Sequence, residues 1–168
     1  MIRLYLMRHG AAATPGAHAA GPDSERPLTS KGIEKTRAAA QGLKNLGIEP
    51  SALVSSPYRR ALQTAEIAAQ VFGIPAAKIR RTEALTPAAK PSALIQELAQ
   101  LRAREILCFG HAPNMDLVIA YVIGTRSPVT ALKKSGVACL ELPAATGVLA
   151  GRGTLVWVLP PKVLRSLA

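Results

Sequence analysis

The chain has 168 residues, of which 49% are hydrophobic and 18% are charged. This length supports one domain with a sizeable core and is too short for two full domains, so we expect a single domain over residues 1–168. The formal net charge of +11 attracts polyanions by long-range steering. Aromatic residues make up only 4% of the chain, the basic residues are scattered, and no zinc-finger, RRM or KH pattern occurs, so we expect no nucleic-acid partner. A solubilising surface and an attraction for phosphorylated or acidic substrates both remain open as reasons for the charge.

The two cysteines and the N-terminal apolar stretch indicate the compartment. Cys108 and Cys139 lie inside apolar segments without CxxC spacing or histidine companions, so they are predicted to be buried free thiols in a reducing compartment. The first apolar stretch is too short to cross a membrane, and no secretory cleavage pattern follows it. We expect a cytoplasmic monomer with no membrane contact, no metal and no cofactor.

Strand and helix patterns alternate along the chain. Near-continuous apolar runs, typical of a buried and mainly parallel sheet, occupy residues 2–7, 52–56 and 105–110. Helical patterns cover residues 30–46, 57–72, 92–103 and 113–123. Two further strand-like runs are expected to pair as a hairpin, at residues 136–142 and 153–159. This order predicts an α/β fold, a three-layer α/β/α sandwich around a mainly parallel sheet.

Polar and cationic residues follow at once where three of these strands end. The three places read "MRHG", "SSPYRRALQTAE" and "FGHAPNMD". In the second, Ser56 is predicted to cap the following helix and Pro57 to occupy its first position. Ligands of open α/β sheets bind outside the carboxyl ends of strands, so these residues are expected to meet in one crevice. Two histidines and at least two arginines beside two helix N-termini would give that crevice a positive potential, which suits a phosphate.

The chemistry of a phosphate site can be assigned to these residues. Arg8 and Arg60 are candidates to neutralise the equatorial oxygens of a phosphoryl group, because a guanidinium binds them bidentately. An imidazole with a free lone pair is a competent nucleophile toward phosphorus, which is the role expected of His9. Gly10 is expected to let the backbone pass close to the substrate, and His111, protonated by anionic surroundings, to stabilise charge on the transferring group.

Four segments of the chain resemble the signatures of the histidine phosphatase superfamily: "LMRHG", "RPLTSKG", "SSPYRRALQTAE" and "GHAPNM". The small size, the "ALTP" segment and the Gly-His-Ala-Pro form resemble its SixA-type phosphohistidine phosphatases. The resemblance implies a phosphoglycerate mutase-like fold and a metal-independent phosphatase. It also implies that His9 is the nucleophile, with Arg8, Arg60 and His111 forming the phosphate pocket.

The resemblance also separates two neighbouring arginines and adds a third. The family pattern places its arginine on Arg60 and a variable residue on Arg59, a choice that helical periodicity alone does not make. Arg26, in "RPLT", matches an arginine that tends to reach the phosphate in SixA-like members, and a structural role at the helix entrance is the alternative. The stretch from Ala11 to Pro27 is expected to form a mobile lip over the site, in which His18 is either a substrate contact or a loop residue without a role.

The chain departs from larger superfamily members in its general acid. Acid phosphatases keep an aspartate directly after the second histidine, and here that position is Ala112. Glu83 is the best substitute by its place in the chain, but it could equally be a surface residue paired with Arg80 or Arg81. Asp116 is expected to be a first-turn carboxylate that complements the helix dipole.

Three functions remain open at this stage. The first is a phosphatase for phosphohistidine or a similar phosphoramidate, with a phosphorylated protein as a possible substrate. The second is a phosphomonoesterase for a small metabolite, which a working acid at Glu83 would favour. The third is a non-catalytic module that binds phosphate or nucleic acid, which the complete set of two arginines and two histidines argues against. A mutase is disfavoured because the chain is too short for the insertions that hold a bisphosphate.

Overall fold

The computed structural model describes residues 1–14, 21–143 and 151–168, and its centre is one six-stranded sheet. The strands are β1 (Ile2–Arg8), β2 (Ala52–Ser55), β3 (Arg80–Arg81), β4 (Glu105–Gly110), β5 (Val137–Leu142) and β6 (Thr154–Leu159). Their order across the sheet is β3-β2-β4-β1-β5-β6. The first four of these pair in parallel, whereas β5 is antiparallel to both β1 and β6. The expected hairpin of the last two strands is therefore confirmed as a strand pair.

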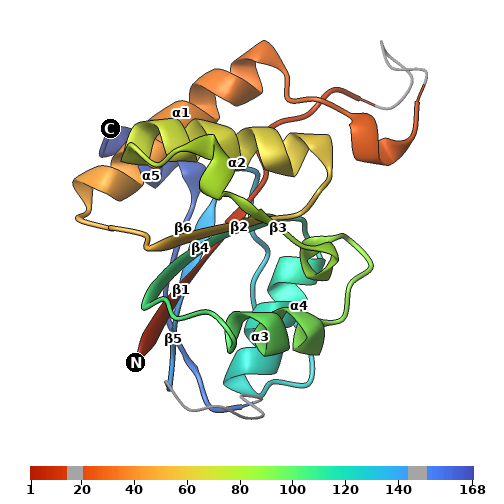
Figure 1. The fold of residues 1–168 in the computed structure, drawn as a ribbon, viewed down its shortest axis with the longest axis vertical. Coiled ribbons are helices and arrows are strands. Elements are labelled where there is room, and N and C mark those ends of the chain that lie inside the picture. Colours follow the sequence, from red (N-terminus) through yellow and green to blue (C-terminus); the bar gives the residue numbers. More distant parts are fainter. Residues whose placement is uncertain (15–20, 144–150) are drawn as a thin grey trace.

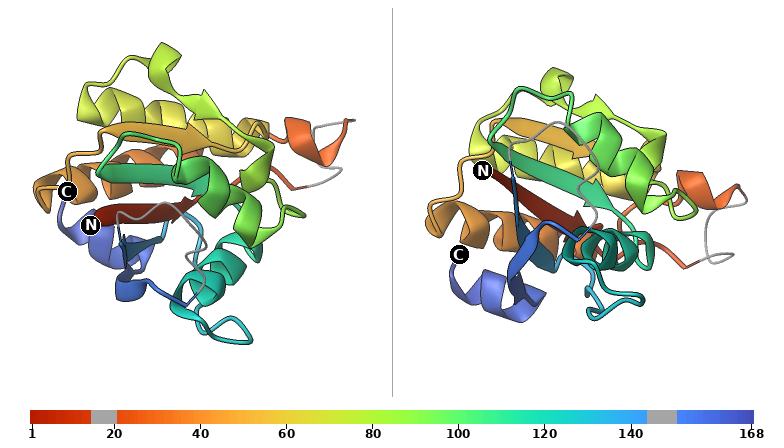
Figure 2. Two further views of the ribbon diagram at one scale, coloured as in Figure 1. Left: turned by 60° about the horizontal axis from the view of Figure 1, so that its bottom comes forward. Right: turned by 90° about the horizontal axis from the view of Figure 1, so that it is seen from below.

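Helices cover both faces of the sheet (Figures 1 and 2). One face carries α1 (Ser30–Asn45), α2 (Arg59–Phe72) and α5 (Pro161–Ser166), and the other carries α3 (Pro91–Leu98) and α4 (Asn114–Ile123). Three short 3-10 helices lie in the connections: η1 (Asp23–Glu25), η2 (Ala76–Lys78) and η3 (Glu83–Leu85). The three-layer α/β/α sandwich expected from the sequence is confirmed.

The first strand shows why its sequence is apolar on both sides. Leu4 and Leu6 are buried against the layer of α3 and α4, while Tyr5 and Met7 are buried against α1, α2 and α5. Successive side chains of a strand point to opposite faces, so a strand covered on both faces needs no polar alternation. Strand β4 is likewise buried on both faces. This packing holds the carboxyl ends of β1 and β4 in fixed positions.

Two helix boundaries differ from the prediction by more than one residue, and one of them matters for the site. Ser56 does not cap a helix: α2 is capped at Tyr58 and begins at Arg59, so Pro57 lies outside it. The Ser56 hydroxyl accepts from Tyr58 N at 3.3 Å, ahead of the helix, and is also bonded to an imidazole, as described below. The helix expected over residues 92–103 ends at Leu98, and the residues that follow pack the side chains of Leu101 and Ala103 onto the core.

Two short elements were not expected from the sequence. Strand β3 has only two residues, both exposed, and so has no apolar pattern. Helix α5 has six residues and buries one side chain, Leu164, too few for a helical period to be recognised. Both cysteines are buried and free, as predicted. Within the described ranges, no helix is both long and apolar enough to span a bilayer.

Candidate active site

Three adjacent strands bring the candidate residues to one edge of the sheet. The backbone pairing continues one residue beyond the strands, because His9 N donates to Gly110 O at 3.0 Å and Ser56 N donates to Phe109 O at 2.9 Å. Strand β4 lies between β1 and β2, so the segments that follow these three strands are neighbours. The rings of His9 and His111 consequently lie with their centroids 5.0 Å apart. The predicted convergence at the carboxyl edge is what the structure contains.

His9 is held as a neutral imidazole with one nitrogen fixed by the backbone. Its Nδ1 lies 2.7 Å from Gly10 O, an acceptor, so Nδ1 carries the proton and Nε2 carries the lone pair. Arg60 Nε donates to this Nε2 at 3.2 Å. Burial is the main cause that lowers the pKa of His9 to about 4, and the nearby Arg60, Arg8 and Lys134 lower it further. At neutral pH the imidazole is therefore uncharged, and its Nε2 is a potential nucleophile.

The reason for glycine at position 10 is packing against α1. A Cβ at Gly10 would lie 2.3 Å from Thr36 Oγ1 and 3.3 Å from Gly32 O, so no side chain fits there. The Gly10 amide also donates to Thr64 Oγ1 in α2 at 3.1 Å. Contacts with α1 and α2 thus fix the backbone directly after His9, and the close approach of substrate to Gly10 stays a prediction.

Arg60 and Arg59 have very different surroundings. The Arg60 side chain is 5% exposed and lies against His9, whereas Arg59 is exposed to solvent. Arg60 belongs to the first turn of α2, and the Tyr58 ring lies 5.2 Å from its guanidinium carbon, close enough for a cation–π contact. Of the two adjacent arginines, the one that the family pattern selects is the one that reaches the histidines.

Arg8 is fixed from the loop that precedes β5. Its Nη1 donates to Leu132 O at 2.7 Å, and burial is the main cause that lowers its pKa. That loop is anchored by Asp116, whose Oδ1 accepts from Thr130 Oγ1 at 2.7 Å and from Leu132 N at 3.0 Å. Asp116 does lie in the first turn of α4 as expected, and it has this second task of holding the loop.

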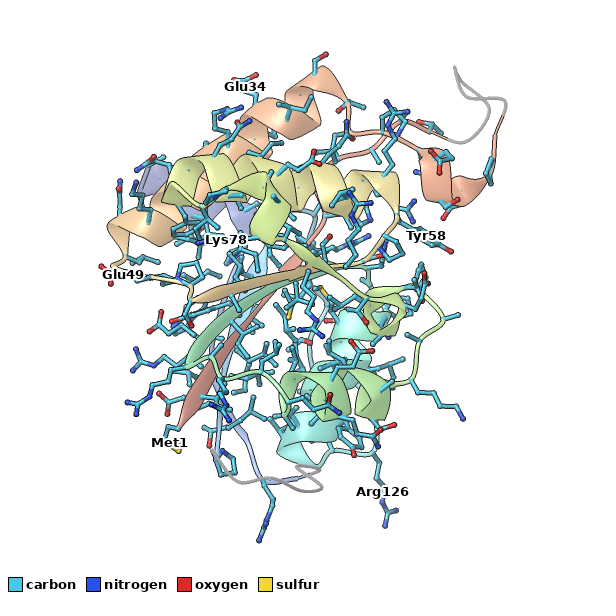
Figure 3. All side chains as sticks on the ribbon, viewed as in Figure 1. Met1, Glu34, Glu49, Tyr58, Lys78 and Arg126 are labelled. Carbon is cyan, nitrogen blue, oxygen red and sulfur yellow. The ribbon has the colours of Figure 1, made fainter. Side chains whose placement is uncertain are left out.

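His111 is positioned by two residues that the sequence did not mark as part of the site. Its Nε2 lies 3.0 Å from Ser56 Oγ, and its ring lies edge-on to Tyr58 with centroids 5.1 Å apart. Figure 3 shows Tyr58 where the chain enters α2. The aromatic residue in "SSPYRR" and the serine before the proline were the available signals, but the serine was interpreted as a helix cap.

The side chains around His111 do not favour the protonation expected for it. Burial, followed by the neighbouring His9 and the positive charge of Arg60, lowers the pKa of His111 to about 3. The prediction assumed anionic surroundings, and the pocket is cationic because Arg8 and Arg60 both face it. A bound phosphoryl dianion would supply the missing negative charge and raise this pKa.

Two buried side-chain nitrogens of the pocket have no protein partner among the described residues, namely Arg8 Nε and His111 Nδ1. Leaving buried polar atoms unpaired costs free energy, and such atoms are found where a ligand completes the hydrogen bonding. Both atoms belong to the cationic end of the pocket beside His9. The arrangement therefore suits a tetrahedral oxyanion bound next to a neutral imidazole nitrogen.

The remaining predicted residues lie further from the histidines. Arg26 is half-buried and donates from Nε to Ala13 O at 2.8 Å and from Nη1 to Asp23 Oδ1 at 2.6 Å, so its guanidinium is engaged within the segment before α1. Glu83 is exposed at the start of η3, directly after β3, and forms no ion pair with an arginine in the part of the chain that the structure describes. His18 lies outside the described residues.

A cavity of about 420 Å³ adjoins the phosphate pocket at Arg8. Its walls come from the start of α4 and from the loop before β5, and include Ala112, Pro128, Ala131 and Lys133. Ala112 is therefore a wall of the space next to the pocket, and its methyl group supplies no acid there. The wall combines alanine, proline and leucine side chains with the polar residues Arg8, Asp116, Thr130 and Lys133.

Comparisons with known proteins agree with this geometry. Residues 4–86 match the family model described as "Histidine phosphatase superfamily (branch 1)". An uncharacterized protein of Picosynechococcus sp. is 33% identical over 148 residues, which cover 86% of this chain and 87% of the relative. The chain belongs to the histidine phosphatase superfamily.

The superfamily members most informative for this chain are SixA proteins. The phosphohistidine phosphatase SixA of Escherichia coli is 29% identical over 167 residues, covering 98% of this chain and 97% of SixA. A solved structure of the protein histidine phosphatase SixA complexed with tungstate superposes with a TM-score of 0.82 at 29% identity, covering 97% of this chain and 99% of that one. The chain is thus an enzyme of the phosphatase type with the histidine phosphatase fold, and SixA is its homologue.

Proposed function

We propose that this histidine phosphatase hydrolyses phosphohistidine, on a protein or in a similar phosphoramidate, without a metal ion. The observation that carries the proposal is the contact of 3.2 Å between Arg60 Nε and the unprotonated Nε2 of His9. It places a fixed cation beside a nucleophilic nitrogen, which is what in-line attack on a phosphoryl group requires. The similarity to SixA over nearly the whole chain supports phosphohistidine as the substrate class.

The proposed reaction has two steps that share one phosphoryl group. His9 Nε2 forms a bond to phosphorus while the bond from phosphorus to the substrate imidazole nitrogen breaks, and the electron pair leaves with that nitrogen. The departing ring leaves as neutral imidazole when its other nitrogen carries a proton. Water then attacks the phosphohistidine formed on His9, releasing inorganic phosphate and restoring the imidazole. Arg8, Arg60 and His111 stabilise the charge on the phosphoryl oxygens in both steps.

The leaving group separates this proposal from a second candidate. Imidazole has a reference pKa of about 6.5 and departs with little help, whereas an alkyl alkoxide needs a general acid, which typically contributes about 100-fold to 10,000-fold. Ala112 offers no acid beside the pocket. The exposed Glu83, which follows a strand at the same edge of the sheet, is the observation that favours a small-metabolite phosphomonoesterase instead.

Parallel turnover of three substrate classes tests the proposal. A phosphohistidine peptide and an aryl phosphate are expected to be hydrolysed much faster than a sugar phosphate, with and without EDTA. Glu83→Gln is expected to affect the sugar phosphate most and the phosphohistidine peptide least, and the exposed Glu97→Gln in α3 serves as the charge-matched control. Equal rates on the sugar phosphate, abolished by Glu83→Gln, would make the protein a metabolite phosphatase. Loss of all activity in EDTA would contradict the metal-independent mechanism.

The cytoplasmic location, the monomeric state and the single domain over residues 1–168 stay predictions. We propose that a phosphorylated protein is the partner, because the open pocket edge and the homology to SixA both suit a phosphorylated side chain carried on a larger molecule. Sedimentation of the purified protein, alone and with a phosphorylated protein domain, measures both its assembly and its binding.

A further inference from the structure

Asp23 binds the buried guanidinium of Arg60 through two different acceptors. Arg60 Nη1 donates to the Asp23 backbone carbonyl at 2.7 Å, and Arg60 Nη2 donates to Asp23 Oδ2 at 2.9 Å. Asp23 begins η1, which packs against α2 (Figure 1). One residue of the segment before α1 therefore holds both terminal nitrogens of an arginine that lies in the first turn of another helix.

A second arginine fixes Asp23 from the other side. Arg26 Nη1 donates to Asp23 Oδ1 at 2.6 Å, and Arg26 Nε donates to Ala13 O at 2.8 Å. The two oxygens of the Asp23 carboxylate are thus divided between two guanidinium groups. These contacts, the one from Arg26 first, hold the pKa of Asp23 below its ordinary value, so the carboxylate is ionised at neutral pH.

The hydrogen bonds that Arg60 makes to the described residues leave two of its five N–H groups for a ligand. A guanidinium is planar and has five N–H groups. Two of the Arg60 N–H groups are bonded to Asp23 and one, on Nε, to His9 Nε2. Because the group is planar, fixing both terminal nitrogens fixes the direction of Nε and of the N–H groups that remain for a phosphoryl oxygen. Without Asp23, a side chain with four rotatable bonds would have the hydrogen bond to His9 and the stacking contact with the Tyr58 ring to orient it, and neither fixes its terminal nitrogens.

We infer that Asp23 is a positioning residue, which orients the guanidinium of Arg60 toward the phosphoryl group on its path to His9. The inference rests on the proposed function and adds to it a role for the segment before α1. The Asp23 side chain is 53% exposed and that of Arg60 is 5% exposed, so Asp23 reaches in from the surface to a cation that has few other acceptors. Arg26 acts one step further out, by fixing Asp23.

A double-mutant cycle on Asp23 and Arg60 tests this role. Asp23→Asn retains the shape of the side chain but loses the charge that holds two guanidinium groups together. We expect it to weaken the binding of inorganic phosphate, measured by calorimetry, and to lower kcat on an aryl phosphate, by roughly tenfold in each case. In the background of Arg60→Ala the same substitution is expected to change neither quantity, because there is no guanidinium left to orient.

The matched control is Glu25→Gln, which removes the same charge from the same 3-10 helix at a residue without a contact to Arg60 among the described residues. It is expected to leave phosphate binding and kcat unchanged. Equal losses from Asp23→Asn with and without Arg60 would show a general effect on the loop and overturn the positioning role. Tighter phosphate binding by Asp23→Asn would overturn it too, because Asp23 would then compete with the ligand. A wild-type protein that binds no phosphate would overturn the proposed function together with this role. Phosphate binding measured by calorimetry does not depend on which substrate is turned over, so a different substrate class would leave the test of Asp23 valid.

Discussion

Arg60 Nε and His9 Nε2 are joined by a hydrogen bond of 3.2 Å, although 51 positions separate the two residues in the chain. The Arg60 N–H group points at the lone pair of the imidazole. A phosphoryl oxygen that arrives at this point would accept that N–H group in place of the imidazole, and the donor would already be in position. Both side chains are almost fully buried, at 7% exposed for His9 and 5% for Arg60. Desolvation makes this pair the electrostatic centre of the pocket, since charge interactions strengthen where water is excluded.

Substitution of the two adjacent arginines should affect kcat to very different extents. Arg60→Ala removes the donor beside the nucleophile and is expected to lower kcat on phosphohistidine by roughly 100-fold to 1,000-fold, or about 3 to 4 kcal/mol. Arg59→Ala removes an exposed cation of the same helix turn and is expected to change kcat little. Steady-state kinetics of both variants measure the difference. Equal losses would mean that the buried position of Arg60 is not what matters for turnover.

A covalent intermediate should be trapped on His9. Rapid acid-free quenching of the enzyme with radiolabelled phosphohistidine peptide is expected to give a label that is labile in acid and stable in alkali, as a phosphorus–nitrogen bond is. His9→Ala is expected to give no label, and His111→Ala to give label at a reduced rate because its imidazole only supports the pocket. A label that persists in His9→Ala would place the nucleophile elsewhere.

Ser56 offers a test of how His111 is held. Ser56→Ala removes the partner of His111 Nε2, leaving a buried imidazole nitrogen unsatisfied, and is expected to lower kcat by roughly tenfold. Ser55→Ala is the matched control, because Ser55 is equally buried but its hydroxyl donates to the Ser56 carbonyl and not to the imidazole. Nitrogen-15 NMR of His111 in the two variants reports whether the ring environment changes only when Ser56 is replaced. An effect of similar size from both serines would indicate a general loosening of the sheet edge.

The buried histidines predict a loss of stability in acid. The pKa of His9 is depressed to about 4, below the value of about 6.5 in an unfolded chain, so the unfolded state binds a proton first as the pH falls. The stabilisation is present above pH 6.5 and is lost between about pH 6.5 and pH 4, by on the order of 2 to 3 kcal/mol for His9 alone. Urea unfolding at pH 7.5 and pH 4.5 measures this loss. His9→Asn should reduce the difference between the two pH values, and an unchanged difference would mean that His9 is not the group responsible.

The sequence was sufficient for every strand of the sheet except the two-residue β3, and for the location of the site, because these depend on strong local signals. The apolar runs of β1 and β4 are long and covered on both faces, and the residues after parallel strands must share an edge whatever the loops do. Arg8, His9 and His111 could therefore be placed together from the sequence alone. The choice of Arg60 over Arg59 came from the family pattern, since one helix turn can direct either residue inward.

What the sequence did not reveal depends on contacts between distant segments. Ser56 has the residue type and the position in the chain of a helix cap. Only the location of His111 in the folded chain shows that the Ser56 hydroxyl has an imidazole as a partner. Gly10 was interpreted through the substrate, whereas the residue that excludes a side chain there is Thr36. The role of Asp23 likewise depends on the packing of η1 against α2, and no local sequence pattern predicts that contact.

The acceptor that fixes Arg8 is a main-chain carbonyl, that of Leu132, and every type of amino acid supplies one. The chain on either side of it, Ala131 and Lys133, is exposed and forms part of the wall of the adjoining cavity. Exchange of these two side chains would therefore reshape the adjoining cavity without removing the main-chain acceptor that fixes Arg8. The side chains at positions 131 and 133 can thus be varied independently of the hydrogen bond that orients Arg8, which makes this stretch of the loop a tolerant place for sequence change beside a buried cation.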